Sequence, residues 1–94
     1  MIVLQIEHPV PDYNNWKKAF DNDPVNRKQS GVKRHKIFRQ ADNPNYVIIE
    51  LEFDTLDEAK KLLAALQPLW KQVEGKIMTG PKARIIEMTE IKEY

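Results

Sequence analysis

Residues 42–59 of this 94-residue chain read DNPNYVIIELEFDTLDEA, a passage that contains the strongest strand signal in the sequence. The run from Tyr46 to Phe53 is rich in β-branched and aromatic side chains, a composition typical of a β-strand. Directly after it, Thr55 and Glu58 have the spacing of a capping box, in which each side chain binds the backbone amide of the other residue. The stretch therefore predicts a strand that passes through a short turn into a helix.

The helix that begins at the capping box has an apolar face at three- and four-residue spacing. Its members are Leu56, Ala59, Leu62, Leu63 and Leu66. Proline is tolerated in the first turn of a helix, so Pro68 is expected to start a last helical stretch, which Gly75 ends. After the following loop, a final strand is expected from Ala83 to about Ile91.

Upstream of the junction, turn residues at positions 41–44 separate the strand from an earlier one at about Val32–Gln40, so the two form a hairpin. The chain opens with a strand at Ile2–His8, where side chains alternate between two faces. Between these strands, Asp12 is placed to cap a helix with aromatic residues at helical spacing, namely Tyr13, Trp16 and Phe20. Asp23–Pro24 can interrupt and restart this helix, and Ser30–Gly31 ends it.

The element order is thus β-α-β-β-α-β, which defines an α+β fold of the ferredoxin-like type. Right-handed crossovers place both helices on one face of a four-stranded antiparallel sheet, with the spatial order 4-1-3-2. We expect residues 1–94 to form a single domain, because the chain lies at the lower end of the size range of one domain.

Composition narrows the classes of function. Fifteen basic and fourteen acidic residues nearly cancel, so no overall charge attracts nucleic acid or a membrane surface. There is no cysteine for disulfides or thiolate metal sites, and two histidines of unspecified geometry predict no metal site. No apolar run reaches the roughly 20 residues of a membrane span. We therefore expect a cytoplasmic protein without a metal or other cofactor and without membrane or nucleic-acid partners.

The sheet face that the helices leave open carries both apolar and acidic side chains. Val3 and Ile48 lie on it together with Glu7, Glu50 and Glu52, and the last strand is apolar on both of its faces. The apolar members favour burial against a second copy, so we expect a homodimer that pairs through this face. Because unpaired acids are costly in a dry interface, the interface must be paired, wet or hollow.

Two registers of the hairpin remain open. With a four-residue loop, His35 lies opposite Glu50, and the two could form an acid–base pair. With a five-residue loop, Lys36 lies opposite Glu50, and His35 turns toward the helices. Glu52 faces a base in either case, Lys33 in the first register or Arg34 in the second.

The chain resembles the dimeric α+β barrel superfamily, which includes antibiotic-biosynthesis-monooxygenase-like and small cyclase-like proteins. The resemblance covers the whole chain and lies in the element order, the helix opening PDYNNWKKAFD, the passage DNPNYVIIELEFDTLDEA and the late strand GPKARIIE. It implies a homodimer that binds a small aromatic or polyketide-like molecule between helices and sheet. The chemistry it implies is that of a cofactor-independent monooxygenase or cyclase.

For such a site, the sequence offers Tyr13, Trp16 and Trp70 as substrate-binding residues and His35 with Glu50 as catalytic residues. Each has a structural alternative, since aromatic residues at helical spacing often belong to a core and acids opposite bases often form an ion-pair ladder. The alternative for the whole chain is a non-enzymatic ligand-binding or interaction domain. No standard catalytic motif decides between these functions.

Overall fold

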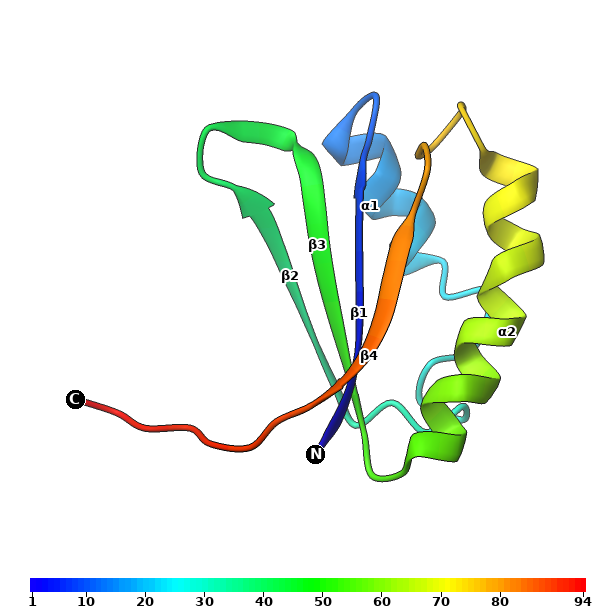
Figure 1. Ribbon diagram of the computed structural model, residues 1–94. Coiled ribbons are helices and arrows are strands. Elements are labelled where there is room, and N and C mark those ends of the chain that lie inside the picture. Colours follow the sequence, from blue (N-terminus) through cyan, green and yellow to red (C-terminus); the bar gives the residue numbers. More distant parts are fainter.

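The computed structural model describes residues 1–94 and contains four strands and two helices (Figure 1). In chain order they are β1 (Ile2–Pro9), α1 (Tyr13–Asp21), β2 (Arg34–Gln40), β3 (Asn43–Phe53), α2 (Leu56–Val73) and β4 (Lys82–Glu87). The strands form one antiparallel sheet in the order β2-β3-β1-β4. The ferredoxin-like topology predicted from the sequence is confirmed.

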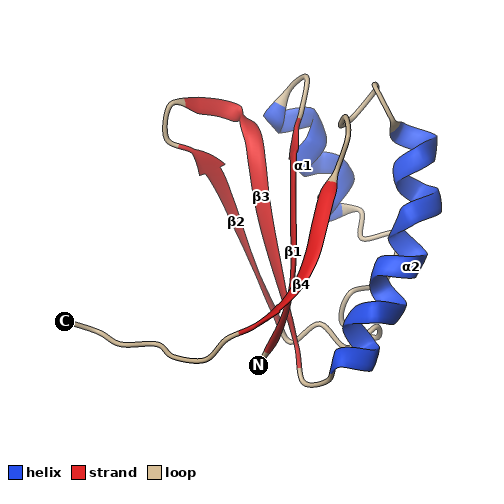
Figure 2. Cartoon of the chain, in the orientation of Figure 1, coloured by secondary structure: helices blue, strands red, loops and turns tan.

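Both helices cover the same face of the sheet and leave the other face open (Figure 2). The apolar core lies between these two layers, where Leu4, Val47, Phe53 and Ala59 are fully buried. They come from β1, β3 and α2, so the central strands and the longer helix carry most of the core. Neither helix is long and apolar enough to cross a membrane.

Local signals fix the starts of both helices. The Asp12 side chain accepts a hydrogen bond from the Asn15 amide and caps α1, as predicted. At α2, the Thr55 hydroxyl oxygen accepts from the Glu58 amide while the hydroxyl group donates to the Glu58 carboxylate. These short-range contacts explain why the strand-to-helix junction could be placed from the sequence.

The two helix interruptions expected at prolines turn out differently. After α1 ends at Asp21, residues 22–33 form turns, so no helix restarts at Pro24. Asp23 and Asn26 both have a φ of 52°, in the left-handed region that a right-handed helix cannot contain. By contrast, α2 runs through Pro68 without a break, and the Ala64 carbonyl that loses its partner there lies on the exposed side, where water can bind it.

The last strand is shorter than expected. β4 ends at Glu87 instead of about Ile91, and the remaining residues lead away from the sheet (Figure 1). Its partner β1 begins at Ile2, which pairs with Glu87, and one further bond joins the Met88 amide to the Met1 carbonyl. The pairing of β4 with β1 ends with this bond, and residues 88–94 form no strand.

The hairpin adopts the second of the two possible registers. Arg34 lies opposite Glu52, His35 opposite Leu51 and Lys36 opposite Glu50. The turn itself is tight, because Gln40 pairs with Asn43. The register shifts between Arg39, which pairs with Val47, and Gln40, so β3 has unpaired residues at this point. This register points His35 to the helix-covered face and Glu50 to the open face.

Candidate functional site

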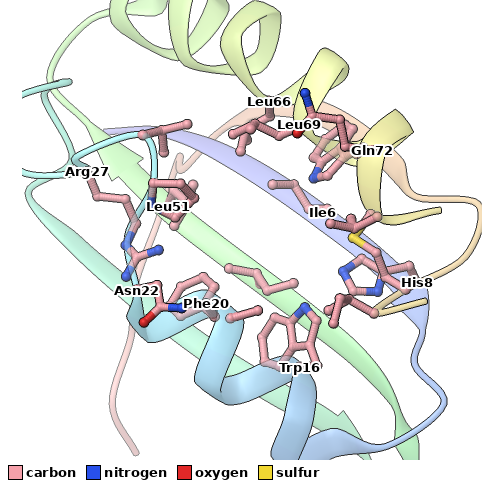
Figure 3. A pocket seen from close by; sticks show the side chains of 18 residues that line it. Ile6, His8, Trp16, Phe20, Asn22, Arg27, Leu51, Leu66, Leu69 and Gln72 are labelled. Carbon is pink, nitrogen blue, oxygen red and sulfur yellow. The ribbon is translucent and has the colours of Figure 1, made fainter. Parts of the chain in front are cut away.

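A cavity of about 340 Å³ lies between the helices and the sheet (Figure 3). It exists because α1 and α2 both pack on the sheet but not on each other. Thirteen of the 18 residues in its wall are hydrophobic, and they come from β1, β3, both helices, the turns after α1 and the loop after α2. Binding sites for small molecules commonly have volumes of roughly 300–1,000 Å³ and walls of this kind.

His8 is a buried base at one end of this cavity (Figure 3). It follows Leu4 and Ile6 in the alternation of β1, so its side chain points toward the helices, and only 2% of the residue is exposed. Its Nδ1 atom lies 3.2 Å from the Pro9 carbonyl oxygen. Since a carbonyl oxygen can only accept, Nδ1 carries the proton in this bond and Nε2 keeps its lone pair.

The environment keeps His8 neutral. Burial lowers the pKa of His8 below its usual value of 6.5, against weaker opposing effects of the Pro9 carbonyl and the Glu74 carboxylate. Nε2 has no hydrogen-bond partner within the chain, yet the protein contains no fully buried, unpaired polar side-chain atom. Nε2 is therefore open to the cavity and can accept a proton from a molecule bound there.

Trp16 joins His8 in the wall of the cavity. Its ring centroid lies 5.9 Å from that of His8 in an edge-to-face arrangement and 5.2 Å from that of Phe20. The three rings form a continuous aromatic surface, which favours a flat aromatic ligand. Trp70 of α2 also lines the cavity, whereas Tyr13 lies outside it and its ring packs beneath the Arg39 guanidinium at 4.6 Å.

The acid–base pair of His35 and Glu50, which only the first of the two open registers allows, does not form. Their side chains lie on opposite faces of the sheet, because the observed register sets Leu51 opposite His35. His35 is exposed, lies outside the cavity wall and contacts the edge of the Phe20 ring at a centroid distance of 5.1 Å. On the open face, the Glu50 carboxylate accepts a hydrogen bond of 3.0 Å from the side-chain Nε2 of Gln5.

The acids of the open face form an ion-pair ladder. Glu52, with 2% exposure, accepts from Arg34 at Nε (3.0 Å) and lies 2.9 Å from its Nη2, and the Lys36 ammonium is 3.5 Å away. The Arg34 hydrogen bond is the main cause that lowers the pKa of Glu52 below its usual range. Gln5 bridges Glu50 to Arg84, whose Nε donates to the Gln5 oxygen at 2.7 Å. Both acids therefore find partners within one chain.

Sequence reasoning missed His8 as a cavity residue. The signal was present, because His8 continues the alternating row Ile2, Leu4 and Ile6, which faces the helices. A histidine in phase with buried aliphatic residues is expected to be buried and, where space remains beside it, to face that space.

Comparisons with known proteins identify the fold. No protein-family model matches the chain, and no curated protein matches it in sequence. A cofactor-independent oxygenase from Streptomyces nogalater superposes with a TM-score of 0.76 at 13% identity, over 96% of this chain and 94% of that one.

Two further solved structures have the same fold. A protein from Nitrosomonas europaea, provisionally named an antibiotic biosynthesis monooxygenase, has a TM-score of 0.68 at 21% identity, over 96% of this chain and all (100%) of its own. A dimeric ferredoxin-like protein from an uncultured marine organism has a TM-score of 0.67 at 12% identity, with 99% and 100% coverage. The chain thus has the same fold as these proteins, the fold that its sequence resemblance predicts.

Proposed function

We propose that the chain binds a small, flat, mainly apolar aromatic molecule in the cavity between its helices and its sheet. The observation that supports this most is the combination of an apolar wall with His8, a neutral base whose Nε2 atom has no partner in the chain. A core that served stability alone would fill such a space and satisfy its buried polar atoms. Trp16 and Trp70 supply ring surfaces for stacking.

As an enzyme, the chain would be a cofactor-independent monooxygenase. A substrate with an acidic CH2 group between aromatic rings would give a proton to His8 Nε2 and leave a carbanion in the cavity. Reaction of that CH2 group with O2 gives a carbonyl group and one water molecule, so dioxygen itself is the oxidant and the atoms balance. The oxygenase from Streptomyces nogalater, with the same fold, also needs no cofactor. The alternative is a protein that binds its ligand without converting it. We propose a cytoplasmic location whether the protein is an enzyme or a binding protein.

The binding proposal is tested with 2-naphthol as the probe in isothermal titration calorimetry. Ala19 lies in the cavity wall, so Ala19→Phe places a ring inside the cavity and is expected to weaken 2-naphthol binding by about tenfold or more. Ala64→Phe makes the same chemical change at an exposed position of α2 outside the cavity and is expected to bind like the unmodified protein. Equal affinity of both variants would place the probe elsewhere and refute the proposed site.

We also propose that two copies pair through the open sheet face. The register puts Lys36, Glu50, Gln5 and Arg84 in one transverse row of polar residues. Apolar residues lie on either side of this row, Phe38 and Ile48 at one end of the face and Val3 and Ile86 at the other. Glu50 and Glu52 already have partners within one chain, so pairing would leave neither of these two carboxylates unpaired. The dimeric ferredoxin-like protein with this fold supports the proposal.

A charge on this face is expected to separate the dimer. Phe38 is 45% exposed in one chain, and Phe38→Glu would place an unpaired carboxylate in the contact, so light scattering should shift from the mass of two chains to that of one. Leu56→Glu changes a residue of similar exposure, 44%, in the first turn of α2, where an acid favours the helix, and should remain dimeric. A single-chain mass for the unmodified protein at micromolar concentration would refute pairing.

A further inference from the structure

The cavity has a second polar end, formed by Arg27 and Asn22 opposite the end with His8 and Trp16 (Figure 3). Arg27 lies in the turns between α1 and β2, and its side chain is only 14% exposed. Its guanidinium carbon lies 3.8 Å from the centroid of the Phe20 ring, over the ring face. This stacking holds the cation against the aromatic wall of the cavity.

The guanidinium still has donors to offer. Its one carboxylate partner within the chain is Asp23, whose Oδ1 atom lies 3.5 Å from Arg27 Nε and also accepts the Arg27 backbone amide at 2.9 Å. The Nη groups make no hydrogen bond within the chain, and no fully buried, unpaired side-chain atom exists in the protein. The Nη donors are therefore accessible to a bound molecule or to water.

The charges around this end favour an anion. His35 also contacts the Phe20 ring, so the pKa of His35 responds to the charges near that ring. Partial burial is the largest cause that lowers the pKa of His35, and the cations of Arg27 and Lys17 lower it further. Among the charged neighbours of His35, Arg27 has the largest effect, ahead of Lys17 and of the opposing Asp21 and Asp23, so the acids do not cancel the Arg27 charge there.

From this arrangement we infer that the natural ligand is an aromatic acid, bound with its carboxylate at Arg27 and a hydroxyl or acidic C–H group at His8. The inference rests on the proposed function and specifies its ligand. Arg27 Nη and Trp16 Nε1 can only donate hydrogen bonds, whereas the neutral His8 ring presents an acceptor at Nε2. A matching ligand therefore needs acceptor oxygens for Arg27 and for Trp16, and a proton donor for His8 at its other end.

The test compares two ligands of the same shape, 6-hydroxy-2-naphthoate and 6-hydroxy-2-naphthamide, by calorimetry. Because hydrogen bonds to a charged group contribute about 1.5–3 kcal/mol, the acid is expected to bind at least about tenfold more tightly than the amide. Arg27→Gln should remove this preference and leave the affinity for the amide within about twofold. Lys28→Gln removes the same charge from the neighbouring exposed residue and should keep the preference.

The outcomes separate the inference from the proposed function. If neither naphthyl ligand nor 2-naphthol binds, the proposed function fails. If the acid and the amide bind equally, or if the preference persists in Arg27→Gln, the inference fails and the binding function stands. If Arg27→Gln does not fold, Arg27→Lys takes its place. Because an ammonium group lacks the paired donors of the guanidinium, this variant should lose at least threefold of the preference for the acid. An undiminished preference in Arg27→Lys also overturns the inference.

Discussion

Replacing Arg34 by alanine is expected to lower the free energy of unfolding by about 2–3 kcal/mol, because it leaves a buried carboxylate without its main partner. Glu52 is 2% exposed and receives two contacts from the Arg34 guanidinium, at 3.0 and 2.9 Å. The Lys36 ammonium remains, at the longer distance of 3.5 Å, and compensates only in part. Urea denaturation at pH 7 measures the change.

Lys33→Ala is the matched control for this variant. It removes the same charge one residue earlier, where the partner Asp54 is 3.5 Å away and both side chains are exposed, so the loss should stay below about 1 kcal/mol. Equal losses in the two variants would contradict the importance of the buried carboxylate.

The effect of Arg34→Ala also depends on pH in a defined direction. Because the folded-state pKa of Glu52 is lowered, its ion pairing contributes fully above the usual carboxyl pKa of 4.5 and is lost as the pH falls through the folded value. The stability difference between Arg34→Ala and the unmodified protein should therefore shrink as the pH falls below 4.5. A difference that is constant from pH 7 to pH 3 would exclude Glu52 as its source.

Replacing His8 by glutamine is expected to lower the proposed oxygenase rate by about 10²–10⁴-fold, because glutamine keeps a polar side chain but cannot take up the substrate proton. Anthrone is a suitable test substrate, since its acidic CH2 group lies between two aromatic rings and its oxidation consumes one O2. An oxygen electrode measures the rate, and calorimetry with 2-naphthol checks that the cavity still binds.

His35→Gln serves as the control for the His8 variant, because His35 lies outside the cavity wall and should leave the rate unchanged. Since burial lowers the pKa of His8, the base should stay deprotonated at and above pH 6.5, and the rate should fall only at lower pH. A His8→Gln variant as active as the unmodified protein would refute the catalytic role. Binding without oxygen consumption in the unmodified protein would leave the ligand-binding function.

Part of the site could be found from the sequence, and part could not. The aromatic spacing of α1 identified Trp16, and Trp70 was recognised by its residue type; both line the cavity. The sequence allowed two registers of β2 on β3, and only one of them would pair His35 with Glu50. The other register forms. A shift of one residue moves every side chain of a strand to the opposite face, so a correct strand assignment still left their positions undecided.

Local sequence patterns predicted the six elements, their order and the junction at Thr55, because caps, turns and periodic apolar faces act over a few residues. Three features became visible only in the folded chain: the register of β2 on β3, the position of His8, Trp16 and Arg27 around one cavity, and the separation of α1 from α2 that leaves the cavity open. These features depend on contacts between segments far apart in the chain. No local pattern encodes them, since each results from how the helices and strands pack together.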